Sequence, residues 1–299
     1  MPASLLSILR IALGASVIAL NTVLHSIPLL LLAVVKLLVP FAGFRHSISR
    51  LLVVIAESWI AVNSWLMSAL GRVEMQVEGL EGLRRAGWYL VICNHQSWVD
   101  IPVLQRVFNR RIPFLKFFLK SQLIWVPVLG LAWWALDFPF MKRYSKEELA
   151  SRPELRGKDI EATRKACEKY RHLPVSVMNF VEGTRFTEAK HDRQGSPYAH
   201  LLLPRAGGIA FVLDAMGGMI DAIVDVTLVY PCGRPGVLDL LAGRVRRVEV
   251  KINAFPVPAQ LLHGDYENDP AFRGRFQAWL NERWAEKDAL LARSVAEAD

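Results

Sequence analysis

The segment YLVICNHQSWVD, residues 89–100, contains in order a strand, a turn and the start of a helix. Tyr89–Cys93 is an apolar run of the length of one strand, and such a run predicts a strand buried on both faces. Polar residues then form a turn, and Ser97 is a suitable N-cap for a helix over Ser97–Phe108. This order is typical of α/β folds, in which ligands bind beyond the carboxyl ends of the strands.

The chain after residue 72 continues this alternation of strands and helices. The predicted strands are Val73–Val77, Tyr89–Cys93, Pro113–Lys116, Phe138–Lys142, Val175–Phe180, Val224–Tyr230 and Val248–Ile252. The other predicted helices are Lys158–Tyr170, Gly207–Met216 and Pro270–Ala292. We therefore predict an α/β fold with a mixed central sheet flanked by helices, preceded by an N-terminal apolar helical membrane anchor. The charged insert over residues 144–173 has no predicted role.

The first residues carry most of the apolar excess of a chain that is 53% hydrophobic. Ser4–Asn21 and Ile27–Val39 are apolar and are separated by a polar turn with His25 and Pro28, which predicts a helical hairpin anchor over residues 1–42. A cleaved signal peptide fits poorly, since the start is not basic and a second apolar stretch follows. No Lys or Arg lies in the turn, so both ends are predicted to be cytoplasmic. A spanning hairpin and one that dips into a single leaflet both remain possible.

Residues 43–72 contain a third apolar helix, His46–Leu70. It is either an interfacial or connecting helix or a buried core helix. Trp59 and Trp65 suit a headgroup boundary and favour the interfacial interpretation. Residues 73–299 then form the α/β domain.

Charge and residue usage restrict the class of partner. The net charge of +8 suits an anionic membrane surface, and no Lys/Arg-rich block or nucleic-acid motif points to nucleic acid. Three cysteines form no CxxC pair, which suits a reducing cytosol, and the scattered histidines predict no metal site. The apolar run 124–136 is broken by Pro127 and Gly130, which favours a core helix or a membrane-touching groove over a further span.

His95 and Asp100 are separated by four residues in the turn and helix start. They can meet only if His95 precedes the helix and Asp100 lies in its first turn, since five residues span 500° of an ideal helix. One interpretation is a capping box of Ser97 with Asp100 and an ordinary loop histidine. The other is that Asp100 orients His95 as a general base. Cys93 is a rival nucleophile, although a buried strand cysteine is more common.

A second motif, FVEGTR, follows a predicted strand at residues 180–185. Gly183 allows a sharp turn close to a ligand, and Arg185 offers a planar fork for a phosphate. Glu182 can accept a hydrogen bond from a hydroxyl or hold Arg185. The alternative is an ordinary loop with an internal ion pair.

Together, NHQSWVD and FVEGTR resemble the two signature blocks of the lysophosphatidic acid acyltransferase (1-acyl-sn-glycerol-3-phosphate acyltransferase) family, of the bacterial membrane-anchored type. The resemblance extends to FPFMKR, which ends at Arg143, to the RAG block from Arg205, and to VTLVYP over residues 226–231. Val181 and Thr227 stand where the family usually has proline. These two departures alter backbone stiffness rather than chemistry.

The resemblance implies transfer of a fatty acyl group to the free hydroxyl of a lysophospholipid, above all 1-acyl-glycerol-3-phosphate, giving phosphatidic acid. The donor would be acyl-CoA or acyl-carrier protein, with no cofactor and no metal. His95 would be the general base and Asp100 its orienting partner. The implied substrate-binding residues are Arg143, Glu182, Gly183, Thr184, Arg185 and Arg205.

The implied partners are membrane phospholipids, the lysophospholipid and the acyl donor. The implied location is the inner (cytoplasmic) membrane, with the catalytic domain facing the cytoplasm. Two other functions remain open: a non-catalytic membrane-bound adaptor on the same scaffold, and a thioester or lysolipid hydrolase.

Overall fold

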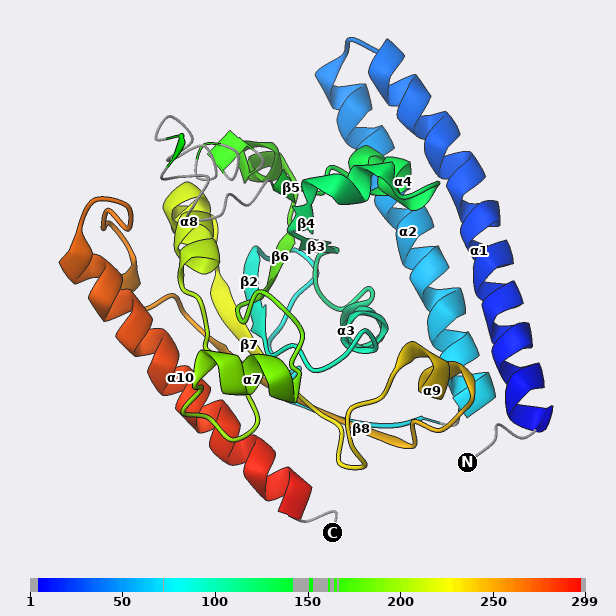
Figure 1. Ribbon diagram of the computed structural model, residues 1–299. Coiled ribbons are helices and arrows are strands. Elements are labelled where there is room, and N and C mark those ends of the chain that lie inside the picture. Colours follow the sequence, from blue (N-terminus) through cyan, green and yellow to red (C-terminus); the bar gives the residue numbers. More distant parts are fainter. Residues whose placement is uncertain are drawn as a thin grey trace.

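A six-stranded sheet forms the centre of the computed structural model, which describes residues 5–71, 73–141, 151–152, 161, 164–165 and 167–296 (Figure 1). The strand order is β1-β8-β7-β2-β6-β3, and the neighbours are parallel except for the antiparallel pair β7–β8. The strands are β1 (Glu74–Glu78), β2 (Tyr89–Cys93), β3 (Leu115–Phe117), β6 (Ser176–Phe180), β7 (Ala222–Val229) and β8 (Arg247–Phe255). A separate parallel pair is formed by β4 (Leu119–Lys120) and β5 (Phe140–Met141). The predicted mixed sheet is confirmed.

Strand β2 lies between β6 and β7, and all five of its residues are buried. A parallel strand that is covered on both faces needs a continuous apolar run, which β2 supplies. Cys93 at its end is aligned with Phe180 at the end of β6. The two sequence motifs therefore begin side by side at the same edge of the sheet.

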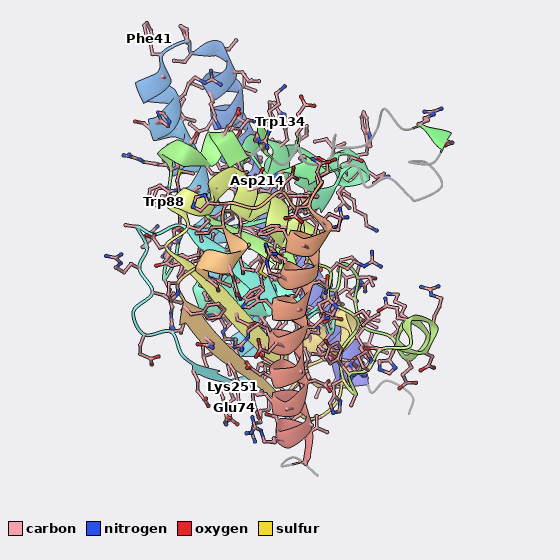
Figure 2. All side chains as sticks on the ribbon, turned by 90° about the vertical axis from the view of Figure 1, so that its left-hand side faces the viewer. Phe41, Glu74, Trp88, Trp134, Asp214 and Lys251 are labelled. Atoms are coloured by element: carbon pink, nitrogen blue, oxygen red, sulfur yellow. The ribbon has the colours of Figure 1, made fainter. Side chains whose placement is uncertain are left out.

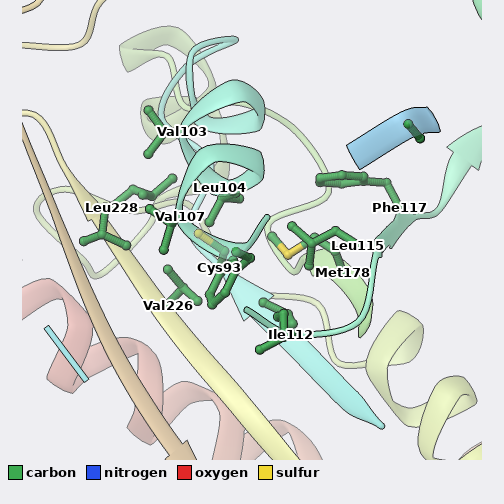
Figure 3. Close-up of a cluster of buried hydrophobic side chains, with 14 of the residues drawn as sticks. Cys93, Val103, Leu104, Val107, Ile112, Leu115, Phe117, Met178, Val226 and Leu228 are labelled. Atoms are coloured by element: carbon green, nitrogen blue, oxygen red, sulfur yellow. The ribbon is translucent and has the colours of Figure 1, made fainter. Parts of the chain in front are cut away.

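Helices cover both faces of the sheet. Among the described residues, the α-helices of this domain are α3 (Asp100–Phe108), α4 (Leu129–Ala135), α7 (Glu188–Gln194), α8 (Gly207–Met216), α9 (Val237–Leu241) and α10 (Pro270–Ala296). Short 3₁₀ segments are η1 (Ser121–Trp125), η3 (Lys169–His172), η4 (Gly217–Met219) and η5 (Ala259–Leu261). Helices α8 and α10 cover one face, while α3 and the N-terminal helices cover the other. Figure 3 shows the core on the α3 side, where Val103, Leu104 and Val107 face strand residues that include Cys93 and Val226.

The N-terminal region forms one long hairpin of two helices, α1 (Leu5–Leu38) and α2 (Ala42–Gly71). The predicted turn at His25 and Pro28 is wrong, because α1 continues through Pro28 without a break. The chain reverses instead between α1 and α2, and Phe41 there lies at the opposite end of the molecule from Glu74 of β1 (Figure 2). Residues 1–42 therefore contain a single helix, α1, instead of the predicted hairpin. The hairpin of the structure consists of α1 and α2.

Polar side chains of α1, including His25 of the predicted turn, form hydrogen bonds with α2. Asn21 Nδ2 donates to Asn63 Oδ1 at 2.9 Å, and His25 Nε2 lies 3.2 Å from Ser58 Oγ. Trp59 Nε1 donates to a hydroxyl of α1 at 3.1 Å. A buried polar side chain needs a hydrogen-bond partner, and α2 supplies the partners along one face of α1.

Helix α2 is partly a core helix, and its predicted position at a membrane interface stays a prediction. Leu52 and Ile60 are buried, and α2 packs against both α1 and α3. Trp59 lies in the hairpin interface rather than at a headgroup boundary, whereas Trp65 is 65% exposed. Helices α1 and α2 are both long and apolar enough to cross a membrane, and the outward face of α1 is lined by exposed leucines. These features indicate association with a membrane.

The broken apolar run 124–136 forms η1 and α4 rather than one long helix. A Cβ at Gly130 would lie 2.0 Å from the carbonyl oxygen of Ile124, so the close approach of these two segments requires glycine. Helix α4 has features of both expected alternatives, a core helix and a groove, since Ala132 and Ala135 are buried while Leu131 and Trp134 are exposed. The insert 144–173 and the predicted helix Lys158–Tyr170 lie largely outside the described residues.

Candidate active site

His95 lies in the turn that leads from the end of β2 to α3. Asn94 fixes this turn, since its side chain donates to the carbonyl of Leu228 at 2.9 Å and accepts from the Leu228 N–H at 2.8 Å. The imidazole of His95 stacks on the ring of Phe180 with a centroid distance of 3.9 Å. Because of these contacts, the ring is held in one orientation with 13% of the side chain exposed.

Asp100 is the first residue of α3 and contacts His95 directly. Its Oδ2 lies 2.8 Å from His95 Nδ1 and also accepts from the N–H groups of Gln96 at 2.7 Å and Ser97 at 2.9 Å. The contact with His95 Nδ1 agrees with the orienting interpretation, whereas the capping box forms only in part, because Ser97 Oγ accepts from the N–H of Val99 and Val99 is the N-cap of α3. The side chain of Asp100 is completely buried, so these donors take the place of water.

Tyr230 completes the surroundings of Asp100 and was not assigned from the sequence. Its hydroxyl donates to Asp100 Oδ1 at 2.7 Å. Burial and the nearby carboxylate raise the pKa of Tyr230, so its hydroxyl keeps the proton that it donates. With Tyr230, four hydrogen-bonding groups surround the two oxygens of Asp100.

Glu182 has a different position from the one that its motif suggested. It is completely buried, and its two oxygens accept from the N–H groups of His95 at 3.1 Å and Leu202 at 3.3 Å. Burial raises the pKa of Glu182 to about 8, against the effect of these two hydrogen bonds. Among the described residues it has no ion pair with Arg185. Glu182 thus supports the backbone of His95, and its predicted contact with substrate stays a prediction.

The loop after β6 is a tight turn, as predicted. Gly183 has φ of +71°, a conformation that favours glycine, and its N–H donates to the carbonyl of Phe180 at 2.9 Å. Lys190 of α7, which was not assigned from the sequence, donates to Thr184 Oγ1 at 2.9 Å and to the carbonyl of Arg185 at 2.8 Å. The loop is therefore braced from α7.

Arg185 is brought to the His95 side of the sheet. Its guanidinium lies 3.9 Å from the centre of the Trp98 ring, and Trp98 lines the same cavity as His95. Cation–π stacking orients the guanidinium without using its hydrogen-bond donors. Arg205 is exposed, with its N–H bonded to the carbonyl of Val181 at 2.8 Å, and Arg143 lies outside the described residues. The substrate-binding roles of these arginines and of Thr184 stay predictions.

A cavity of about 460 Å³ opens beside His95. Its lining is largely apolar and comes from the helical hairpin, α3, α4, α9 and the β3 region, and six members are Leu29, Leu66, Phe117, Ala132, Phe180 and Leu240. This volume lies within the usual range for small-molecule sites, about 300–1,000 Å³. The hairpin is therefore part of the site wall as well as an apolar surface.

The rival nucleophile Cys93 is not suited to the reaction. It is completely buried, and this burial raises the pKa of its thiol well above the usual range. Figure 3 shows it in the core beneath α3, among Leu104 and Val226. Cys93 is a packing residue.

Arg234 is a further cation close to the His95 turn that the sequence did not reveal. Its Nε donates to Gln96 Oε1 at 2.5 Å, and its guanidinium lies 3.7 Å from the centre of the Phe186 ring. Gln96 and Arg234 are separated by 138 residues, so no local signal connects them. Arg234 helps to fix the turn that carries His95.

The comparisons agree with this geometry. A family model described as acyltransferase matches residues 74–232. The 1-acyl-sn-glycerol-3-phosphate acyltransferase gamma of Mus musculus is 29% identical over 67% of this chain and 52% of its own length. Lysocardiolipin acyltransferase 1 of Danio rerio is 27% identical over 80% of this chain and 60% of its own. The chain thus spans about half to three fifths of the length of these curated relatives.

A solved structure, the 1-acyl-sn-glycerophosphate (LPA) acyltransferase PlsC from Thermotoga maritima, is 17% identical with a TM-score of 0.43 and covers 87% of this chain and 98% of its own. The family model covers more than half of this chain and includes the strand ends that carry His95, Asp100 and Glu182. The chain belongs to the acyltransferase family.

Proposed function

We propose that this protein transfers a fatty acyl group from a thioester to the free hydroxyl of a lysophospholipid, with 1-acyl-glycerol-3-phosphate as the acceptor and phosphatidic acid as the product. The observation that carries this proposal is the pair of His95 with the buried Asp100 at the wall of a largely apolar cavity. The names of the relatives, which act on acylated glycerol phosphates and lysocardiolipin, support the acceptor class. The donor is acyl-CoA or acyl-carrier protein.

The contact between His95 and Asp100 supports a proton path through Nε2 of His95. With Nδ1–H donating to Asp100, Nε2 is left as the acceptor for a hydroxyl proton. The hydroxyl oxygen attacks the thioester carbonyl while Nε2 takes its proton, and the positive imidazole is stabilised by Asp100. The C–S bond then breaks, and the imidazole returns the proton to the leaving thiolate. A positioned base of this kind contributes about 10²–10⁴-fold to the rate.

The cavity and Arg185 suit the two ends of the substrates. The apolar lining suits a fatty acyl chain, whose burial there is favourable in proportion to its area. Arg185, stacked on Trp98 at the same cavity, suits a phosphate, which a planar guanidinium can bind through two donors. We assign Arg143 and Arg205 to the same headgroup.

The packing of the hairpin supports an anchor that lies in one leaflet. Gly14 of α1 packs against Leu241 of α9, and Lys36 of α1 pairs with Asp137 at 2.7 Å. These two attachment points are about 22 residues apart, which is roughly 33 Å along a helix. The hydrocarbon layer is about 30 Å thick, so an α1 that crossed it perpendicular to the membrane plane would place the attached α/β domain inside the bilayer. An α1 that lies within one leaflet avoids this. We place the domain on the cytoplasmic side of an inner membrane.

The function is tested with His95→Ala, which removes the base and leaves a small side chain in the turn. The purified full chain, supplied with labelled acyl-CoA and lysophosphatidic acid, is expected to lose at least about 10²-fold in turnover. The control His263→Asn changes an exposed histidine on the loop before α10 and should retain activity. Circular dichroism confirms that both variants fold.

The fate of the label separates the possible functions. Label in phospholipid supports transfer, label in free fatty acid would show a hydrolase, and no turnover by the wild type would show an adaptor. Full activity of a folded His95→Ala variant would remove the proposed mechanism.

A further inference from the structure

A second pocket, of about 350 Å³, shares Phe114 with the catalytic cavity. Phe114 lines both spaces, and its ring packs edge-on against Phe138 with a centroid distance of 6.0 Å. The walls of the second pocket come from α2, the β3 region and the chain from η3 to β6, with Arg85 from between β1 and β2 and Asp137 from between α4 and β5. It contains none of the residues to which we assign acyl transfer. This pocket, called the α2–β3 pocket below, has no role in the reaction as described.

Positive charge predominates in the α2–β3 pocket. Its charged lining consists of four cations and two carboxylates: Arg50, Arg85, Lys116, Lys169, Glu57 and Asp137. Glu57 pairs with Arg85 at 2.6 Å, and Asp137 pairs with Lys169 at 3.4 Å. Each carboxylate also has a second cationic neighbour outside the pocket lining. Both negative charges are therefore already neutralised by other groups.

Arg50 and Lys116 are the two cations of the pocket that do not take part in these ion pairs. In the described part of the chain, neither has a carboxylate within ion-pair distance. Lys116 Nζ lies 4.5 Å from the centre of the Tyr170 ring. Burial and the repulsion of neighbouring lysines lower the pKa of Lys116 to about 8, although Asp137 opposes this effect. An anion in the pocket would stabilise the charged form of Lys116.

The apolar part of the pocket indicates the chemistry of the ligand. Val53 and Val54 line it from α2, and Val54 is 48% exposed. Leu51, beside Arg50 in the chain, is 46% exposed. The pocket thus opens on the flank of the apolar hairpin. A ligand with an anionic group joined to an apolar body uses both parts of this site, whereas a free phosphate uses only the cations.

We propose that the α2–β3 pocket binds the phosphate group of an anionic phospholipid from the leaflet that holds the hairpin, with Arg50 and Lys116 as its ligands. The proposal rests on the membrane placement given under Proposed function. A lipid bound here holds α2 at the membrane surface and leaves the catalytic cavity open. It is a docking site, separate from the acceptor site at Arg185.

The test measures binding of the full chain to phosphatidylcholine vesicles with and without added phosphatidylglycerol. The double variant Arg50→Gln/Lys116→Met is compared with Arg275→Gln/Arg293→Gln, which removes two positive charges from exposed positions on α10. Each cation near an anionic surface contributes several-fold to affinity, so the pocket variant should lose about tenfold or more on phosphatidylglycerol vesicles. The α10 variant should lose clearly less, and acyl transfer in detergent should stay within about twofold in both.

A second readout follows Lys116 itself. Acetylation by an amine-specific reagent, located by mass spectrometry, should be slowed at Lys116 by phosphatidylglycerol vesicles and not by phosphatidylcholine vesicles. Protection by inorganic phosphate alone would identify a soluble ligand and overturn the lipid assignment. Equal losses of affinity in the two double variants would show diffuse charge attraction and overturn the site.

Failure of the membrane placement is distinguishable from failure of this site. Wild-type protein that binds neither kind of vesicle would overturn both. If the wild-type protein binds phosphatidylcholine vesicles and its affinity does not increase when phosphatidylglycerol is added, only the lipid site would be overturned.

Discussion

Asp100 shows how one buried carboxylate can serve folding and chemistry together. Its Oδ2 accepts from two backbone N–H groups at the start of α3 and faces His95 Nδ1. The backbone bonds fix the carboxylate, and the fixed carboxylate then fixes the imidazole. Ionised acceptors form the stronger hydrogen bonds, so the geometry of this pair is well defined before substrate arrives.

Tyr230→Phe removes the donor to Asp100 Oδ1 and leaves a buried carboxylate oxygen without that partner. A hydrogen bond to a charged group contributes about 1.5–3 kcal/mol, so kcat should fall roughly 10- to 100-fold. Because Tyr230 acts through Asp100 and His95, KM for the lysolipid should change little. Steady-state kinetics of the purified variant check both values.

Tyr198→Phe is the matched control for this change. The Tyr198 hydroxyl donates to the carbonyl of Asn281 at 3.2 Å, away from the His95 turn. Its removal should leave kcat within about twofold. A similar fall in both tyrosine variants, or an effect on KM alone, would argue against a positioning role for Tyr230.

At the scale of elements, the sequence pattern predicted the bounds of those strands and helices that depend on residues close together in the chain. The bounds Tyr89–Cys93 and Gly207–Met216 were predicted as β2 and α8 have them. Helix α3 begins at Asp100 rather than at the predicted Ser97: its N-cap is Val99, and Ser97 lies in the preceding turn, where its N–H donates to the Asp100 carboxylate. Helix geometry allowed His95 and Asp100 to meet only if His95 precedes the helix, and the structure shows both this placement and their contact.

Contacts between distant segments set the limit of such prediction. Asn21 looks like the end of an apolar stretch and His25 like a turn residue until their partners on α2 are known, and those partners lie more than thirty residues away. The same holds for Tyr230 at Asp100, which is 130 residues distant in the chain. Strand order and the burial of Glu182 are also consequences of tertiary packing, which periodicity does not encode.

The packing of α1 on the α/β domain can be tested at a glycine. A Cβ at Gly14 would lie 2.8 Å from Leu70 Cδ1 and 3.0 Å from Leu241 Cδ2, so Gly14→Leu overfills the junction of α1 with α2 and α9. Overpacking of this kind costs about 1–3 kcal/mol. Thermal unfolding in mild detergent should show a lower midpoint.

Gly43→Leu is the control, since no atom lies within 4 Å of a Cβ built there. Gly43 is also helical, so this substitution gains helix propensity without a clash and should be neutral or stabilising by up to about 1 kcal/mol. Equal midpoints for the two variants would show that α1 is not packed on the domain as described.

At the scale of the whole molecule, the sheet joins the two motifs through Glu182. The register of β2 and β6 places His95 and Glu182 beyond neighbouring strand ends, and the carboxyl of Glu182 accepts from the N–H of His95. The same carboxyl accepts from the N–H of Leu202, in the segment that leads to α8. One buried acid thus connects three parts of the chain, and its titration affects the stability of the fold.

The free energy of unfolding is expected to fall as pH rises from about 4.5 to about 8. Burial raises the pKa of Glu182 from 4.5 to about 8 in the folded protein. Between these values the folded state holds a proton that the unfolded state releases. Glu182 therefore lowers the free energy of unfolding by at most about 1.4 kcal/mol for each pH unit.

The variant Glu182→Gln has no carboxyl group to titrate at this position. It should lower stability by about 1–3 kcal/mol at low pH, since its amide N–H₂ faces backbone donors, but its curve should be flatter across the window. Urea unfolding in mild detergent at several pH values gives both curves, with exposed Glu282→Gln as the control that keeps the wild-type slope. Parallel curves for wild type and Glu182→Gln would mean that Glu182 is already ionised in the folded protein at low pH.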